Sequence, residues 1–295
     1  MRVLITHTDL DGLGSAIFAI ADKLVDRVYC WNNGYLDKLV LDDNVVIITD
    51  LSFDKSITDN AIVFDHHPAS KGITNGVYDG NRCATKIFYE EYVDKHNKTR
   101  DKFAYLIDIY DRWQTKMSQF DETLDLNRVF EYMVKTRPNC LVYDSRFTMD
   151  YGIAHHTPYY TFIISMVEML KGEVFKLTHT LQDYADQIHF EEDTFYEKMV
   201  DTHQIRRDSK GNLFAIVRTK KYMNENCNRF LEEYSDIRYI LNLGFKGISA
   251  RSIDDTFNLN DIRGLAGHPK AAGGAFDENF MKSLENGRIK ELGYR

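Results

Sequence analysis

MRVLITHTDLDGLGSAIFAI (residues 1–20) places one histidine and two aspartates directly after a short apolar run. Residues 2–6 have the composition of a buried strand, and residues 12–24 carry apolar side chains at helical spacing. Side chains at i, i+2 and i+4 of an extended segment point the same way, so we expect His7, Asp9 and Asp11 to converge past the strand end. Two carboxylates held together raise each other's pKa, and a bound cation removes that cost. The stretch therefore predicts a metal site at the edge of a sheet.

The same order of elements continues along the chain. Residues 25–32, 44–50 and 61–67 are typical of strands, and helix-compatible segments separate them. Alternating strands and helices predict an α/β domain with a parallel sheet. Two of these strands end in Asp50 and in Asp65-His66-His67, and the carboxyl ends of parallel strands are where sites form in such sheets.

The rest of the chain predicts two further parts. Strand signals fade between about 115 and 205, where the segments are typical of helices, and a mixed α/β pattern returns from about 210. We therefore expect an N-terminal parallel-sheet domain over residues 1–125, a helical connector over 126–208 and a smaller mixed α/β domain over 209–295.

Composition excludes several classes of protein. The net charge of −8 disfavours a protein that coats long duplex DNA, whose affinity depends on basic surface. A small phosphate ligand remains compatible, because bound metal ions would supply positive charge. The four cysteines form no CxxC pair and predict reduced thiols in the cytoplasm. No stretch approaches the roughly 18 to 20 apolar residues of a membrane span, and the first residues do not resemble a signal peptide.

Residues that commonly bind metal ions gather at the predicted strand ends and on one predicted helix. They are His7, Asp9, Asp11, Asp50, Asp65, His66, His67 and Asp111. Carboxylates and imidazoles without thiolates suit Mn²⁺ or Mg²⁺ better than a structural zinc ion. The set is too large for one ion, whereas two ions that share a carboxylate would use it, as in two-metal phosphoryl transfer.

Five short motifs, taken in order, resemble a known family. HTDLDG (7–12), ITDLS (48–52) and FDHH (64–67) resemble the DHH family of phosphoesterases. GISARSIDD (247–255) and GLAGHPKAAGG (264–274) resemble the DHHA1 substrate domain of that family. The family's loop has three glycines before its histidine, whereas here Leu265 and Ala266 interrupt the run from Gly264 to His268. The resemblance extends from residue 3 to about 276 and leaves the helical middle unmatched.

The resemblance implies a role for each matching residue of the first domain. His7 and Asp9 would hold one metal ion, and Asp11, His66 and Asp111 would hold the second. Asp50 would bridge the two ions. His67 would contact the substrate phosphate or support the ligands, and Asp65 would orient a histidine. Asp108 and Asp111 lie one helical turn apart, so both could face the site; the apolar run before Asp111 fits the family pattern better.

In the second domain the resemblance implies a binding site for a terminal phosphate of the substrate. Arg251 and His268 would bind it, and Gly267 and Gly273 would let the backbone approach closely. The implied activity is a two-Mn²⁺ phosphodiesterase, with Mg²⁺ or another divalent ion as alternatives, that releases nucleoside monophosphates from short single-stranded RNA or DNA.

Several alternatives stay open at this point. The substrate could instead be a cyclic dinucleotide or its linear product, a phosphoadenosine nucleotide or polyphosphate, and the fold could serve a non-catalytic nucleotide sensor. The number of subunits is undecided, with a homodimer among the alternatives.

Overall fold

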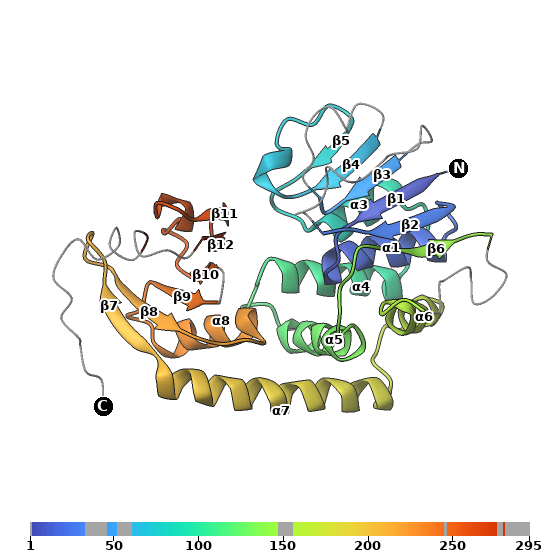
Figure 1. Cartoon of the computed structure of the whole chain (residues 1–295). Coiled ribbons are helices and arrows are strands. Elements are labelled where there is room, and N and C mark those ends of the chain that lie inside the picture. The colour runs from blue at the N-terminus through green and yellow to red at the C-terminus, as the bar shows by residue number, and fades with distance from the viewer. Residues whose placement is uncertain are drawn as a thin grey trace. The chain divides into compact units, whose positions relative to one another are not determined.

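The computed structural model describes residues 2–32, 46–51, 61–146, 156–244, 247–275 and 280. The chain divides into two compact units, residues 1–188 and 189–295, and the described residues form one six-stranded sheet in each (Figure 1). We describe each unit by itself.

The first unit contains a largely parallel sheet. Its strands are β1 (Val3–Thr6), β2 (Arg27–Cys30), β3 (Val46–Thr49), β4 (Ala61–Asp65), β5 (Gly76–Tyr78) and β6 (Cys140–Asp144). They lie in the order β5-β4-β3-β1-β2-β6, in which every neighbouring pair is parallel except β2 and β6. The predicted α/β fold with a parallel N-terminal sheet is confirmed.

Helices cover one face of this sheet, as Figure 1 shows for α1, α3 and α4. The helices are α1 (Leu10–Ala21), α3 (Ala84–Tyr92), α4 (Lys98–Asp111), α5 (Phe120–Met133) and α6 (Tyr160–Met169), with a 3₁₀ turn at Pro68–Ser70. Leu4, Ile47 and Phe64 pack into the helical core, whereas their neighbours Ile5 and Ile48 belong to a separate cluster. Because successive strand residues point to opposite faces, strands buried on both faces read as continuous apolar runs.

The segment expected to be a helical connector is less uniform than its sequence predicts. It supplies α5, β6 and α6 to the first unit, and α7 (His179–Thr202) crosses the boundary at residue 188. The helical interpretation is wrong at β6 and at β7 (Gln204–Arg207), which form the outer strands of the two sheets. Both strands are short. β6 pairs with β2, which is distant in sequence, and β7 pairs with β8 across a turn, so local periodicity does not reveal either strand.

The second unit contains the mixed sheet that the sequence predicts. Its remaining strands are β8 (Leu213–Val217), β9 (Tyr239–Leu243), β10 (Ile248–Arg251), β11 (Ala266–His268) and β12 (Ala271–Gly274), in the order β11-β12-β10-β9-β8-β7. Only β8 and β9 are parallel, and α8 (Met223–Glu233) connects them; a 3₁₀ turn spans Leu259–Asp261. Phe214, Tyr239 and Phe257 stack in its core, with ring centroids 5.1 and 5.2 Å apart.

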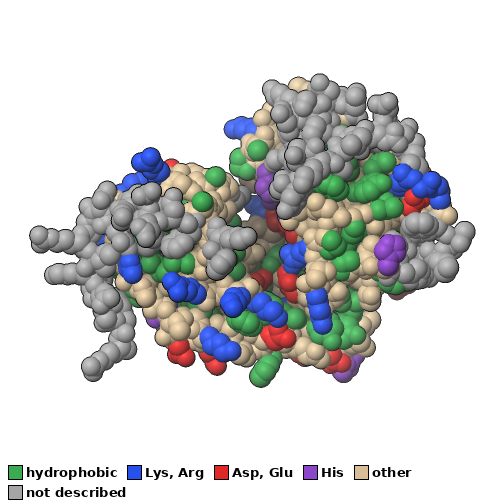
Figure 2. Space-filling model, viewed as in Figure 1, with side chains coloured by type: hydrophobic (Ala, Val, Ile, Leu, Met, Phe, Trp, Pro, Cys, Tyr) green, Lys and Arg blue, Asp and Glu red, His purple; other side chains and the backbone are tan. Residues whose placement is uncertain are grey.

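Two general features bear on function. No helix in the described ranges is long and apolar enough to cross a bilayer. Acidic and basic side chains are interspersed on the face of the molecule shown in Figure 2.

Candidate metal centre

Three neighbouring parallel strands bring ligand-type side chains to one edge of the first sheet. His7 follows β1, Asp50 follows β3, and His66 follows β4 directly. The first turn of α1 adds Asp11, and the last residue of α4 adds Asp111. The sequence argument from strand ends therefore holds in three dimensions, because parallel strands end at the same edge.

The side chains form three overlapping groups whose ligand atoms lie within 4.8 Å of one another. The groups are His7, Asp9 and Asp50; Asp11, His66 and Asp111; and Asp50, Asp65, His66 and His67. Asp50 belongs to the first and third of these groups, and His66 belongs to the second and third, so the groups form one continuous cluster.

The second group has a spacing that hydrogen bonds do not explain. His66 Nε2 lies 3.7 Å from Asp11 Oδ2, 3.4 Å from Asp50 Oδ1 and 3.5 Å from Asp111 Oδ2. These distances exceed those of charge-assisted hydrogen bonds. They are close to the roughly 3 to 3.5 Å that separates adjacent ligands around an ion with bonds of about 2.1 Å.

Buried polar atoms at the centre lack partners. Within the described part of the chain, Asp50 Oδ2, His66 Nε2 and Asp111 Oδ2 are buried and form no hydrogen bond. Each such atom costs roughly 1–3 kcal/mol when it is left unsatisfied. A divalent cation would satisfy all three, so the donor set fits a hard or borderline metal ion.

The electrostatics of the centre point the same way. Burial raises the pKa of Asp11 well above its usual value, and the charges of Asp50 and Asp111 raise it further. Burial also raises the pKa of Asp111, to about 6. Burial alone would lower the pKa of His66, but the charge of Asp111 and its contact with Asp50 raise it to about 11. Without a cation, the cluster therefore retains protons to offset its negative charge.

Two buried threonines, which the sequence did not single out, fix the strand ends. Thr49 Oγ1 donates to Thr6 Oγ1 at 2.7 Å, and Thr6 Oγ1 donates to the carbonyl of Gly12 at 2.8 Å. They join β1, β3 and α1 directly beside His7 and Asp50. Asp50 itself has a left-handed backbone with φ of 58°, a strained conformation that non-glycine residues adopt at functional sites.

The HTDLDG stretch needs its aspartate and its glycine for local reasons as well. Asp9 is the N-cap of α1 and accepts the amide hydrogen of Gly12 through Oδ1, while its Oδ2 lies 2.7 Å from His7 Nδ1. A Cβ at position 12 would lie 2.4 Å from the carbonyl oxygen of His7. Only glycine lets the helix start this close to His7.

Comparisons with known proteins agree with this geometry. No family model matches the chain. The chain is 24% identical to oligoribonuclease NrnB of Bacillus subtilis (strain 168), over 92% of this chain and 72% of that protein. Its fold resembles that of the pGpG-specific phosphodiesterase PggH from Vibrio cholerae, with a TM-score of 0.59, 15% identity and 97% of both chains covered. It also resembles a solved DHH domain described as a member of a family of ribosomal proteins, with a TM-score of 0.52, 14% identity, and 96% and 85% of the chains covered.

In the order of its motifs and in its fold, the chain resembles the DHH/DHHA1 phosphoesterase family. The convergence of the side chains of the first three motifs at one sheet edge agrees with this resemblance.

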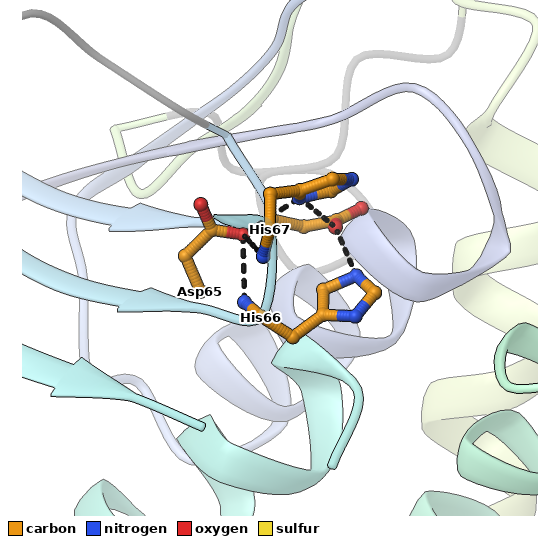
Figure 3. Close-up of side chains that lie close together, drawn as sticks. Asp65, His66 and His67 are labelled. Carbon is orange, nitrogen blue, oxygen red and sulfur yellow. Dashed lines mark hydrogen bonds and ion pairs between the residues drawn. The ribbon is translucent and has the colours of Figure 1, made fainter. Parts of the chain in front are cut away.

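Both carboxylate oxygens of Asp65, the aspartate of the DHH motif, accept hydrogen bonds; those to the two histidines of the motif are drawn in Figure 3. Asp65 Oδ1 accepts the amide hydrogens of His66 and His67 at 2.8 and 3.2 Å, and His67 Nδ1 lies 2.8 Å from the same oxygen. Asp65 Oδ2 accepts a hydrogen bond from Ser70, which the sequence did not single out. Although burial alone would raise the pKa of Asp65, the hydrogen bonds from His67 and Ser70 hold it below its usual value. Asp65 is therefore placed to orient His67 and has little capacity left for a metal ion.

Of the two candidate aspartates on α4, Asp111 faces the metal centre and Asp108 does not. Asp108 is buried, and its Oδ1 accepts the amide hydrogen of Cys83 at 2.7 Å. Its Oδ2 lies 3.1 Å from Lys86 Nζ and 3.6 Å from Arg112 Nη1. Both oxygens are thus occupied, whereas the Oδ2 of Asp111 faces His66.

The DHHA1-like unit places the expected phosphate-binding residues on the two strands that flank β12. Arg251 on β10 and His268 on β11 are both register partners of Ala271 on β12. Arg251 Nε donates to Asn224 Oδ1 at 3.0 Å, and the side chain of His268 lies outside the described residues.

The glycines of this loop have structural reasons of their own. Gly267 has a φ of 142°, and a Cβ there would lie 2.8 Å from the carbonyl oxygen of Ala271, so the hairpin itself requires this glycine. At Gly273 a Cβ would meet only Ile248 O, at 3.4 Å, which is ordinary contact.

Proposed function

We propose that this protein is a metal-dependent phosphodiesterase that hydrolyses short oligonucleotides to nucleoside monophosphates. The observation that carries the proposal is the set of carboxylate and imidazole groups that meet at Asp50. The group of His7, Asp9 and Asp50 and the group of Asp11, His66 and Asp111 support a pair of divalent ions, because Asp50 Oδ1 lies 3.4 Å from His66 Nε2 and so connects the two groups. Mn²⁺ is the first choice, with Mg²⁺ or another divalent ion as alternatives.

In this proposal each ion has its own ligands. His7 and Asp9 would hold one ion, Asp11, His66 and Asp111 would hold the other, and Asp50 would be shared. When bound, the ions would lower the pKa of a water molecule and offset the negative charge of the phosphate.

His67 is the proposed contact of the chain with the reacting phosphate. Burial alone would lower its pKa, but the hydrogen bond to Asp65 and the charge of Asp50 raise it to about 9. At pH 7 its ring is therefore a cation that is held through Nδ1 by Asp65. Its Nε2 is left to donate to a phosphate oxygen, and such a hydrogen bond is strongest when the donor is charged.

The DHHA1-like unit is the proposed site for the far end of the substrate. Arg251 and His268 would bind its terminal phosphate, with the backbone at Gly267 and Gly273 close by. Support comes from the register that puts both Arg251 and His268 opposite Ala271. A site that binds a terminal phosphate favours short substrates.

The names of the relatives support the substrate class. One is an oligoribonuclease and another acts on the linear dinucleotide pGpG, so RNA fragments come first and linear dinucleotides second. A net charge of −8 also disfavours long polyanions. The chain's four cysteines, all described, are free, which suits the proposed cytoplasmic location.

The test measures release of monophosphates, with Mn²⁺ present, from 5′-labelled RNA of two, about five and about 24 nucleotides. The wild type is compared with an Asp65→Ala, His66→Ala double variant. The control is a His179→Ala, Asp183→Ala double variant, because it removes a histidine–aspartate pair, 3.2 Å apart, that lies exposed on α7.

We expect the wild type and the control to degrade the short RNAs and the Asp65/His66 variant to be inactive. Faster turnover of pGpG than of other dinucleotides would favour the second substrate class. Mn²⁺-loaded wild type that cleaves none of these substrates would contradict the proposal and favour polyphosphate hydrolysis or a nucleotide sensor.

A further inference from the structure

The first turn of α3 lies between carboxylates from two other helices. The amide of Ala84 donates to Asp11 Oδ2 at 2.8 Å, and the amide of Thr85 donates to Asp11 Oδ1 at 2.7 Å. The preceding amide, that of Cys83, donates to Asp108 Oδ1 at 2.7 Å. Three successive amides at the start of α3 thus bind one aspartate of α1 and one aspartate of α4.

This arrangement links two side chains of the metal centre that are far apart in sequence. Asp11 is held directly by α3, and Asp111 lies one helical turn beyond Asp108 on α4. Both approach the same atom, His66 Nε2, at 3.7 and 3.5 Å. The bond between Asp108 and Cys83 therefore fixes α4 against the turn that holds Asp11.

The contact is buried and local. Asp108 is 2% exposed, and Cys83, Ala84 and Thr85 are fully buried. In such surroundings a backbone amide that loses its acceptor cannot turn to water, so the turn must shift to find another partner. Metal sites tolerate ligand displacements of only about 0.5 Å.

We propose that Asp108 is a positioning residue for the metal centre, acting through the amide of Cys83 to set Asp11 against Asp111. The inference rests on the proposed function, because it assumes that Asp11 and Asp111 hold one ion. It requires of Asp108 an oxygen acceptor for Cys83 and does not require its negative charge.

The test is a calorimetric titration of the metal-free protein with Mn²⁺. Asp108→Ala removes the acceptor, and we expect it to weaken Mn²⁺ binding at one class of site about 10- to 100-fold, as loss of a residue that orients a ligand typically does. Asp108→Asn keeps an oxygen acceptor for the amide of Cys83, while the side chain of Lys86 turns toward solvent. We expect its Mn²⁺ affinity to lie within about threefold of that of the wild type.

Asp101→Ala is the matched control. Asp101 lies on the same helix and also binds α3, because it accepts a hydrogen bond from Tyr89 Oη at 2.6 Å, but at the opposite end of the helix pair. This variant loses one hydrogen bond between the two helices, whereas Asp108→Ala loses those from Cys83 and Lys86. We expect its Mn²⁺ affinity to equal that of the wild type, although its melting temperature falls.

A second pair of variants removes the bond from the other side and serves also if Asp108→Ala does not fold. Cys83 has a φ of −69°, which proline adopts, so Cys83→Pro deletes the donor with its backbone angle kept. Cys83→Ala keeps the amide. We expect Cys83→Pro alone to weaken Mn²⁺ binding.

Other outcomes would overturn the proposal in distinguishable ways. If Asp108→Asn lost as much affinity as Asp108→Ala, together with one bound ion, Asp108 would be a ligand. If folded Asp108→Ala and Cys83→Pro bound Mn²⁺ like the wild type, the contact would be only structural. If the wild type itself bound no Mn²⁺, both this inference and the proposed function would fail.

Discussion

His7 and His66 have pKa values that oppose their proposed role as ligands. Burial alone would lower both, but Asp9 and Asp50 raise the pKa of His7 to about 11, and Asp111 with its neighbours raises that of His66 to about 11. Both rings are therefore protonated in the metal-free protein at pH 7. An imidazole must lose this proton to bind a metal ion.

We therefore predict that Mn²⁺ binding at pH 7 releases at least two protons, one from each of these histidines. Since both pKa values lie above the working range, affinity should rise with pH by about tenfold per unit for each proton released. Calorimetry in buffers of different ionisation enthalpy measures the number of protons, with the His179→Ala, Asp183→Ala variant as control. A binding enthalpy independent of the buffer would contradict the prediction.

Asp9 has two roles that substitution can separate, since it caps α1 and also lies beside His7. Asparagine caps a helix about as well as aspartate, whereas alanine costs roughly 0.5–2 kcal/mol. We expect Asp9→Ala to be less stable than Asp9→Asn by about that amount in urea unfolding of the metal-free protein. Both variants should lose Mn²⁺-dependent activity, because neither keeps the carboxylate. Activity in Asp9→Asn would mean that capping is the only role of Asp9.

At the scale of the elements, the sequence reveals the candidate ligands better than the contacts that place them. His7, Asp50 and His66 each follow a strand with a clear apolar signal, so the site is predictable from strand ends and motif order. Thr6 and Thr49 are ordinary strand residues in sequence, and their role depends on the pairing of β1 with β3.

The two strands that the sequence analysis did not predict, β6 and β7, lack such a local signal. β6 lies in a stretch with helical neighbours and gains its stability from pairing with β2 more than a hundred residues earlier. The choice between Asp108 and Asp111 is similar, because one helical turn separates them and only the positions of α3 and β4 distinguish them. Periodicity within a segment contains no information about its distant partner.

The start of α1 gives a prediction in which two effects oppose each other. Alanine in place of a helical glycine gains up to about 1 kcal/mol in helix propensity. At position 12, however, the new Cβ would lie 2.4 Å from the carbonyl oxygen of His7, and backbone clashes of this kind cost about 1–3 kcal/mol. The clash should win, because relief requires movement of His7 itself.

We therefore expect Gly12→Ala to lower the free energy of unfolding by about 1–2 kcal/mol and to weaken Mn²⁺ binding. Gly80→Ala is the control, because the nearest atom to its Cβ would be the hydroxyl of Tyr78, at 3.2 Å, on a side chain that can move. Urea unfolding and Mn²⁺ titration measure both effects. Wild-type affinity in a destabilised Gly12→Ala would show that the position of His7 does not matter for binding.

At the scale of the whole molecule, the proposed metal centre lies in the first unit alone, whereas both units have hydrophobic cores. All residues of the proposed metal centre belong to residues 1–188, and the described residues of each unit form two hydrophobic clusters. A ligand that binds only the folded state stabilises the unit that contains its site. Mn²⁺ should therefore stabilise the first unit selectively.

The two tryptophans, Trp31 and Trp113, both lie in the first unit, so their fluorescence reports its unfolding alone. At free Mn²⁺ one hundred times the Kd, we expect a stabilisation of about 2.7 kcal/mol for each bound ion, which is roughly 5 to 10 °C in Tm per ion for a unit of this size. The Asp65→Ala, His66→Ala variant should show a much smaller shift. An equal shift in that variant would place the bound Mn²⁺ elsewhere, and an unchanged Tm in the wild type would mean that the folded first unit has no Mn²⁺ site.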